Sequence, residues 1–345
     1  MKISTEQEMK EIIQSCHLNF LIGAGTSNPF LPLLNDIEVR LSKETDETKK
    51  IKIYKEYFGG AMLPNKSIID GTVDRKDGSN FKITYDSYVK FFRTISHILL
   101  KRKSSLMSKQ ANIFTTNIDI VMETALEESN INYNDGFVGQ IKPVFGLSNF
   151  KKSLLKRSLH FEHVSEIPLF NLIKTHGSLT WKKSGDKIVL SKLEHFDKTL
   201  LDKDGAAFQA KYDELLIVNP RQEKFKETVL DLTYYELLRM YSSELEKENS
   251  VLFVMGFSFA DQHIQEITIR AANSNPTLKV YIFCYKPAEL SNMKKNIRFD
   301  ELRYSNIEIL VPEDDTEPAR FTLGKVNELY FEKIAPTIQE ITLPK

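Results

Sequence analysis

The amino-acid sequence predicts an α/β protein with a doubly wound, mostly parallel sheet. Short apolar runs alternate with helix-length segments along the 345 residues, and this alternation is typical of a parallel sheet covered by helices on both faces. Several of the runs end in glycine or small polar residues, as expected at the carboxyl edge of such a sheet, where ligands bind. We therefore expect one Rossmann-like domain over residues 1–345, with helical and loop insertions at about 42–110 and 139–170.

Composition limits the classes of function. Lysine plus arginine and aspartate plus glutamate both number 47, so bulk charge gives no argument for binding to nucleic acid or to a membrane. The first ten residues are polar and mixed in charge, unlike a signal peptide. No apolar run approaches the ~18 residues of a membrane-spanning helix. The only cysteines, Cys16 and Cys284, lie in apolar segments. This pattern favours a reducing cytoplasm and excludes a four-cysteine zinc site.

The first half of the chain begins with an amphipathic helix over 3–16 and a buried strand that ends at Ile22. The further elements expected here are helices over 33–41, 42–58, 85–107 and 120–129, and a strand over 112–115. The stretch from Gly59 to Asn80 is rich in turn-forming residues. We expect it to be a loop or lid, with glycines as candidate hinges at Gly59, Gly60, Gly71 and Gly78.

The second half begins with an irregular segment over 139–170. The elements expected after it are strands over 172–175, 215–218, 251–255, 279–285 and 307–311, a hairpin over 178–190, and helices over 225–247, 261–272 and 319–334. Trp181 would lie in the core of the hairpin or in a pocket wall. Asp261 is placed to cap the helix that follows it.

The stretch Phe20-Leu-Ile-Gly-Ala-Gly-Thr-Ser27 reads as a strand that breaks into a glycine turn and then enters a helix. Gly23 and Gly25 can adopt positive φ and allow a ligand close to the backbone. Thr26 and Ser27 are suited to capping the helix. A strand, a glycine turn and a helix N-terminus together form an anion site, although a plain tight turn explains the same pattern.

Four predicted strands end in residues that can carry chemistry. The four ends are Gly23–Ser27, Thr116–Asp119, His176-Gly177 and Gly256–Ser258. Each has an ordinary explanation, because asparagine forms turns, Asp119 can cap the next helix and His-Gly is commonly a turn. Parallel strands nevertheless bring their carboxyl ends to one edge of the sheet, so we expect these groups to lie together.

The ordered set resembles the sirtuin family and its NAD-consuming relatives. That family has a GAG-x-S turn, a T-x-N-x-D strand end, an H-G pair and a later G-x-S, in this order. The corresponding residues here are Gly23-Ala24-Gly25-Thr26-Ser27, Thr115-Thr116-Asn117-Ile118-Asp119, His176-Gly177 and Gly256-Phe257-Ser258. The resemblance covers roughly residues 18 to 290.

The departures from the deacylases of that family are equally informative. Those enzymes usually carry two C-x-x-C pairs that bind zinc, which this chain cannot supply, and a G-I-P-x-F-R stretch, which here reads Asn28-Pro-Phe-Leu-Pro32. Gly256-Phe-Ser-Phe-Ala-Asp-Gln-His263 is instead similar to the sirtuin-like effector domains of bacterial anti-phage systems. Those domains hydrolyse NAD to nicotinamide and ADP-ribose.

The resemblance implies NAD as substrate, no zinc and a catalytic set of Asn117, Asp119 and His176. Asn117 would order a water and bond the substrate. Asp119 would contact the nicotinamide carboxamide and lie near the developing positive charge, and His176 would accept a proton from a ribose hydroxyl or from the water. The residues expected to bind NAD are Gly23, Ala24, Gly25, Thr26, Ser27, Thr116, Gly256 and Ser258.

The resemblance also implies a biological setting. We expect a cytoplasmic NAD glycohydrolase of abortive infection that forms a homo-oligomer and works with a HerA-type ATPase or a short Argonaute. Direct binding to nucleic acid or to a membrane is not expected. Two alternatives remain open. One is a zinc-free deacylase or ADP-ribosyltransferase, and the other is a non-catalytic sensor that binds NAD or ADP-ribose.

Overall fold

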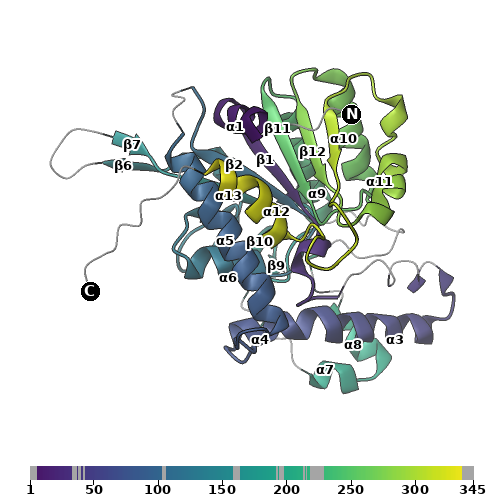
Figure 1. The fold of residues 1–345 in the computed structure, drawn as a ribbon. Helices are drawn as coiled ribbons and strands as arrows, with labels where there is room; N and C mark the ends of the chain where they lie inside the picture. Colours follow the sequence, from purple (N-terminus) through teal and green to yellow (C-terminus); the bar gives the residue numbers. More distant parts are fainter. Residues whose placement is uncertain are drawn as a thin grey trace.

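The computed structural model describes residues 6–335 except 33–36, 38–39, 42, 103–105, 158–163, 192, 194–197, 213, 215 and 218–228. A seven-stranded sheet forms its centre, in the order β13-β12-β11-β1-β2-β8-β3, and all neighbouring strands are parallel (Figure 1). The strands are β1 His17–Ile22, β2 Gln110–Thr115, β3 Tyr133–Asn134, β8 Leu169–Lys174, β11 Ser250–Met255, β12 Lys279–Phe283 and β13 Ile307–Leu310.

The strand order reverses beside β1. The chain passes from β1 to β2 and β8 on one side, and later to β11, β12 and β13 on the other. In open α/β sheets, this switch point is where ligands bind, outside the carboxyl ends of the strands. The predicted fold class, a doubly wound and mostly parallel sheet, is therefore confirmed.

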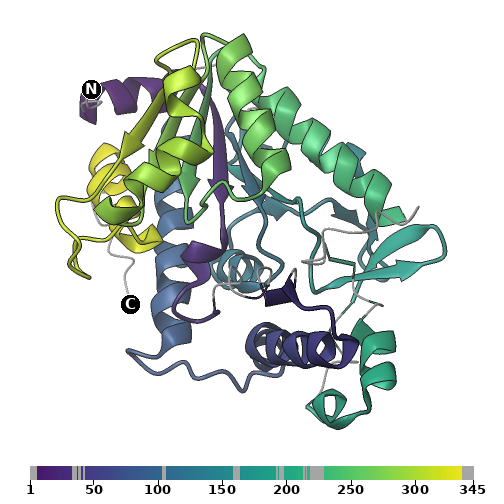
Figure 2. The ribbon, with the colours of Figure 1, turned by 90° about the vertical axis from the view of Figure 1, so that its right-hand side faces the viewer.

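Helices cover both faces of the sheet, as Figure 2 shows. One face carries α1 Glu6–Ser15, α5 Asn80–Leu100, α6 Val121–Glu128, α12 Leu323–Val326, the π-helical stretch η6 Asn327–Phe331 and α13 Glu332–Ile334. The other carries α9 Val229–Leu245, α10 Gln262–Ser274 and α11 Leu290–Asn296. Successive side chains of β1 point to opposite faces of the sheet. Phe20 therefore packs in the hydrophobic core on the α5 face, and Leu21 packs in the core on the α10 face.

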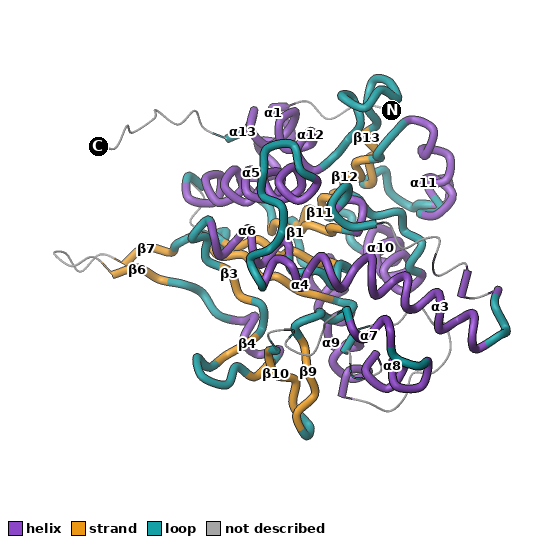
Figure 3. Tube along the Cα trace, turned by 90° about the horizontal axis from the view of Figure 1, so that it is seen from below, coloured by secondary structure: helices purple, strands orange, loops and turns teal. Residues whose placement is uncertain are grey.

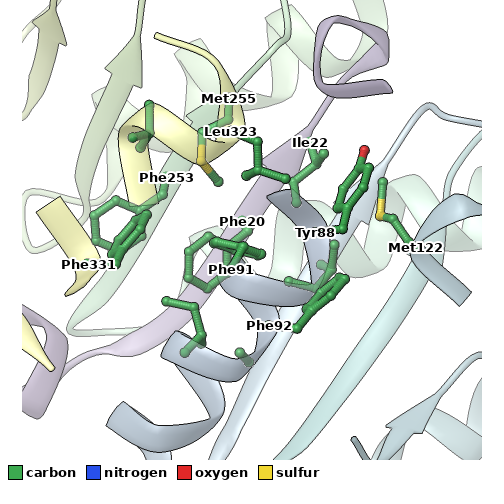
Figure 4. Packing of buried hydrophobic residues seen from close by; sticks show 14 of the residues in the cluster. Phe20, Ile22, Tyr88, Phe91, Phe92, Met122, Phe253, Met255, Leu323 and Phe331 are labelled. Atoms are coloured by element: carbon green, nitrogen blue, oxygen red, sulfur yellow. The ribbon is translucent and has the colours of Figure 1, made fainter. Parts of the chain in front are cut away.

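Aromatic packing holds the first face together (Figure 4). The Phe20 ring lies 5.3 Å from that of Phe91 on α5 and 5.9 Å from that of Phe331 on η6. Phe253 of β11 lies 5.2 Å from the same Phe331 ring. Residues from both ends of the chain thus cover the strands that meet at the switch point.

A separate helical module lies below the carboxyl edge of the sheet in Figure 1. It consists of α3 Glu47–Tyr57, the π-helical stretch η2 Phe58–Met62, α4 Leu63–Ile69, α7 Thr199–Asp202 and α8 Gly205–Tyr212. Its own core pairs Tyr54 with Tyr212, at 5.0 Å between ring centroids, and Phe58 with Phe208, at 5.7 Å. Side chains 150 or more residues apart in sequence therefore form one unit.

This module corrects the predicted loop at Gly59–Asn80. Residues 58–69 continue the helix of α3, and Gly59 and Gly60 lie inside it, where neither has positive φ. Only residues 70–79 form a loop, and within it Gly71 and Gly78 adopt φ of 69° and 83°. The glycine and proline content misled the prediction because burial against α8 outweighs the low helix propensity of these residues.

The rest of the described chain forms two small antiparallel sheets (Figure 3). One has the order β4-β5-β10-β9 and the other pairs β6 with β7. Their strands are β4 Phe137–Val138, β5 Val144–Phe145, β6 Leu155–Arg157, β7 Val164–Glu166, β9 Trp181–Ser184 and β10 Lys187–Leu190. The predicted hairpin over 178–190 is thus confirmed. Trp181 packs within this sheet, 4.7 Å from the Phe145 ring.

Other boundaries differ from expectation. α5 begins at Asn80 instead of Tyr85, because Ser79 Oγ accepts a hydrogen bond from the Lys82 amide and caps it. The final helix is divided by the π-helical stretch η6. Most of the predicted helix 33–41 lies outside the described residues, as do residues 215 and 218 of the predicted strand 215–218. Within that strand, Ile217 forms only an isolated antiparallel bridge with Gly177. Among the helices that are described, none has the length and apolarity to span a bilayer.

Candidate functional site

The loops after β1 and β11 meet backbone to backbone at the switch point. The Gly25 amide donates to Gly256 O at 3.0 Å, and a Cβ at Gly23 would lie 2.5 Å from that same oxygen. The φ of Gly23 is −106°, and Gly25 is not among the residues with positive φ, whereas Gly256 has φ of 61°. The expectation that Gly23 and Gly25 adopt positive φ was therefore wrong. They are required by close packing between two loops.

The predicted helix start after this turn is also wrong. Ala24–Ser27 forms a single 3₁₀ turn, η1, and Asn28 follows it in extended conformation. The hydroxyls of Thr26 and Ser27 do not cap a helix. They lie 2.7 Å and 3.2 Å from the hydroxyl oxygen of Tyr88, a buried residue of α5. Burial raises the pKa of Tyr88 well above its usual value, so this phenol remains a neutral hydrogen-bonding group.

Asn117 lies at the end of β2, buried and held by two loops. Its amide nitrogen Nδ2 donates to Gly23 O and to Ser27 Oγ, each at 3.2 Å, and its backbone N–H donates to Thr115 Oγ1 at 3.0 Å. Its side-chain oxygen Oδ1 is buried, and no group in the described part of the chain bonds to it. Such an atom loses hydration without compensation unless a ligand or water bonds to it. The orphan oxygen therefore fits a site that receives a polar substrate.

Asp119 divides its carboxylate between two partners. Oδ2 accepts a hydrogen bond from Ser27 Oγ at 3.0 Å, and Oδ1 accepts one from the amide of Val121, the first residue of α6. Asp119 therefore bonds to the start of α6, as a helix cap would, and also links this segment to the glycine turn. The helical module supports this segment, because Asn65 of α4 accepts from the Ile120 amide at 2.9 Å.

Lys174, at the end of β8, is a charged residue that the sequence did not single out. Its ammonium lies 2.6 Å from Glu123 Oε1 on α6, 3.3 Å from Ser178 Oγ and in contact with the backbone oxygen of Asp119. Burial raises the pKa of Glu123 to about 7, against the opposite effect of Lys174. The pair of Lys174 and Glu123 could be predicted only from the knowledge that β8 lies beside β2 in the sheet.

His176 follows β8 and meets Asp261 across the sheet edge. Its Nε2 lies 2.7 Å from Asp261 Oδ2, while Asp261 Oδ1 accepts hydrogen bonds from the amides of His263 and Ile264. The predicted cap of α10 is confirmed, but no local pattern in the sequence indicates the bond to His176. Burial raises the pKa of Asp261, but the interactions with His176, the Ile264 amide and His263 together lower it, so the pKa lies below its usual value.

The remaining predicted residues lie around these groups. Gly177 has φ of 77°, and a Cβ there would lie 2.1 Å from Leu216 O, so the His-Gly pair is also a tight turn. Ala24 and Thr116 are half-buried, whereas Ser258 is exposed. The backbone oxygen of Ser258 accepts a hydrogen bond from Asn296 at 2.8 Å.

Hydrogen bonds join the four predicted strand ends in a closed ring. Asn117 links the β2 loop to the β1 turn, and the glycines link that turn to the loop after β11. Thr175 donates from its backbone N–H to Thr115 O at 2.9 Å, which joins the β8 loop to β2. The bond between His176 and Asp261 closes the ring. The arrangement offers a base, a carboxylate and an unpartnered amide oxygen at one edge of the sheet.

The chain matches the model of one known protein family. A family model described as a SIR2-like domain matches residues 111–310. One solved structure, titled "Structural Basis for the Mechanism and Regulation of Sir2 Enzymes", is similar at a TM-score of 0.40 and 10% identity, with 95% of this chain and 96% of that chain covered. No curated protein matches the sequence significantly. Because the family match covers more than half of the chain and includes Asn117, His176 and Asp261, the chain belongs to the SIR2-like family, which fits an NAD-utilising enzyme.

Proposed function

We propose that this protein is an NAD hydrolase that cleaves NAD to nicotinamide and ADP-ribose. Membership in the SIR2-like family supports the use of NAD. The observation that carries the hydrolytic proposal is a histidine bonded to a carboxylate, His176 with Asp261, at the same sheet edge as the unpartnered Asn117 Oδ1. A base and an open hydrogen-bond acceptor are what a site needs to hold and deprotonate a water.

The chemistry requires little beyond these groups. The bond between ribose C1′ and the pyridinium nitrogen breaks, and its electron pair leaves with a neutral nicotinamide, so no general acid is needed. Positive charge develops on the ribose, where the carboxylate of Asp119 stabilises it. Water bonds to C1′ and gives its proton to His176, which later releases it to solvent. Asn117 Oδ1 accepts a hydrogen bond from that water or from a ribose hydroxyl.

The NAD-binding assignment is the one made from the sequence, with one refinement. The proposed contacts are Gly23, Ala24, Gly25, Thr26, Ser27, Thr116, Gly256 and Ser258. The hydroxyls of Thr26 and Ser27 already bond to Tyr88 and, for Ser27, to Asp119. The backbone N–H of Thr26 is also engaged, because it donates to Gly23 O at 3.1 Å. The contact that we propose from this pair to a diphosphate therefore comes from the backbone N–H of Ser27.

We further propose that the enzyme depletes NAD in the cytoplasm as an abortive-infection effector. Ungated activity would harm its own cell, so we infer a homo-oligomer and a partner of the HerA-type ATPase or short Argonaute kind. The loop over 70–79 and the insertion at 139–170 are the segments proposed to gate access. Light scattering together with the NAD cleavage rate across protein concentrations, with and without partner, tests this. A monomer that is fully active at every concentration contradicts it.

One assay separates the proposed function from its alternatives. Purified protein is incubated with NAD, with and without an acylated peptide, while nicotinamide and ADP-ribose are followed. Release of both products without peptide supports the hydrolase. Nicotinamide release that requires the peptide indicates a zinc-free deacylase or ADP-ribosyltransferase. Binding of NAD or ADP-ribose without any cleavage indicates a sensor.

A further inference from the structure

Asp261 is fixed in place by the start of α10. Its Oδ1 accepts the amides of His263 and Ile264 at 2.9 Å and 3.1 Å, which leaves Oδ2 for His176 Nε2 at 2.7 Å. Both side chains are largely buried, with 20% of His176 and 17% of Asp261 exposed. A helix-capping carboxylate whose second oxygen holds a histidine is preorganised, because the backbone of the helix sets its position.

The bond crosses the sheet. His176 follows β8, and Asp261 follows β11, whereas β1 and β2 lie between these strands. Neighbouring strands are about 4.8 Å apart, so three spacings separate the two strand ends by about 14 Å. The bond therefore joins the loops that follow two strands that are not neighbours, and Asn117, whose side-chain oxygen is unpartnered, follows one of the strands between them.

The hydrogen bond determines which imidazole nitrogen is available. An ionised carboxylate only accepts hydrogen bonds, so the nitrogen that faces it carries the proton and the other keeps its lone pair. We propose that Asp261 is a positioning residue that holds His176 as the Nε2–H tautomer and leaves Nδ1 to take the proton from water during NAD cleavage. This inference rests on the proposed function.

Asp261→Asn is the informative variant. Asparagine caps helices about as well as aspartate, so α10 is preserved. The side chain of this asparagine has one oxygen, which is needed to accept the helix amides, so its NH₂ group faces His176. Because that NH₂ group donates a hydrogen bond, Nε2 must accept it, and the imidazole proton moves to Nδ1. We expect kcat for NAD cleavage to fall by about 10²- to 10⁴-fold, with KM and the melting temperature near those of wild type. Asp261→Glu, which keeps a carboxylate, should recover part of the lost kcat.

A measurement independent of activity completes the test. Imidazole ¹⁵N shifts distinguish the two tautomers, and His176→Gln assigns the signal among the 7 histidines. We expect Nε2–H in wild type and Nδ1–H in Asp261→Asn. An Nδ1–H form in wild type, or wild-type kcat in Asp261→Asn, overturns the inference and leaves Asp261 as a cap alone. If wild type releases no nicotinamide, the proposed function fails, while the tautomer still decides whether Asp261 positions His176.

Discussion

Asn117 and His176 are the residues on which the proposed chemistry depends most directly. We expect Asn117→Ala and His176→Ala each to reduce NAD cleavage by at least about 10²-fold, since each removes a group that binds or deprotonates the water. Nicotinamide release measures this. Circular dichroism and the melting temperature show whether the fold is retained.

The control for these variants is His97→Ala, which removes a histidine from the last turn of α5. It should leave the cleavage rate within about twofold of wild type, because His97 has no assigned role in the site. A folded Asn117→Ala or His176→Ala protein that cleaves NAD at the wild-type rate would remove that residue from the mechanism.

Glu123 gives the site a pH-dependent contribution to stability. Its pKa in the folded protein is about 7, whereas the ordinary value is 4.5. Between these values the folded state holds a proton that the unfolded state has released. The contribution of Glu123 to the free energy of unfolding is thus fully present below about pH 4.5 and is lost as the pH rises through about 7.

We therefore expect Glu123→Gln to flatten the fall in stability between about pH 5 and pH 7. Urea unfolding at intervals across this range measures the effect as the difference between variant and wild type. Glu127→Gln, on the same helix but bonded to Tyr133 near the surface, is the matched control and should retain the wild-type slope. Identical slopes for wild type and Glu123→Gln would show that Glu123 is ionised throughout.

At the scale of elements, the contact between the β1 and β11 loops sets the geometry of the switch point. Gly256 and Gly185 have nearly the same φ, 61° and 60°. A Cβ at Gly256 would lie 2.6 Å from the Thr26 backbone nitrogen, whereas one at Gly185 meets nothing within 4 Å. Positive φ alone costs about 1–2 kcal/mol for a residue other than glycine.

We expect Gly185→Ala to lower the free energy of unfolding by about that amount and Gly256→Ala to lower it further, because the loops must also move apart. Chemical denaturation measures both changes, and NAD cleavage should decline only for Gly256→Ala. Equal losses of stability for the two variants would mean that the loops separate freely and that their contact does not shape the site.

The sequence predicted the core strands and their polar ends correctly because both signals are local. A buried parallel strand is a continuous apolar run, as in Val251–Met255, and its end is marked by the glycine or asparagine that follows. Apart from 215–218, each of the predicted strands of the seven-stranded sheet is present, within a few residues of the expected bounds. Within that sheet, only the short edge strand β3 was not predicted, since its two residues carry no periodicity. The strands β4 to β7 of the small sheets were not predicted either.

The connections between elements could not be predicted, because they depend on which strands become neighbours. The bond of Asp261 to His176 joins residues 85 apart, and that of Ser27 to Asp119 joins residues 92 apart. From the sequence, Asp261 was predicted as a helix cap, and Ser27 as a cap and an NAD contact, but neither of these two partners was predicted. The helix over 58–69 was missed for the same reason, since the partner that buries it is α8.

At the scale of the whole molecule, the sheet separates the two cysteines. Cys16 immediately precedes β1 and so lies at the amino edge, whereas Cys284 immediately follows β12 and lies at the carboxyl edge. A strand of five or six residues, at about 3.3 Å per residue, places them on the order of 17–20 Å apart. Zinc–sulfur bonds are about 2.3 Å long, so the two thiolates cannot share one ion.

Since no other cysteines exist, we expect the fold and NAD cleavage to be independent of zinc. Purified protein should contain far less than one zinc per chain by mass spectrometry of the metal, and 1,10-phenanthroline should change neither the melting temperature nor the cleavage rate. The double variant Cys16→Ser with Cys284→Ala controls for ligation by thiols and should give the same metal content. Stoichiometric zinc that disappears in this variant, together with loss of activity in chelator, would contradict the expectation and favour the deacylase alternative. The melting temperature is informative here because structural zinc, where it is present, contributes directly to folding.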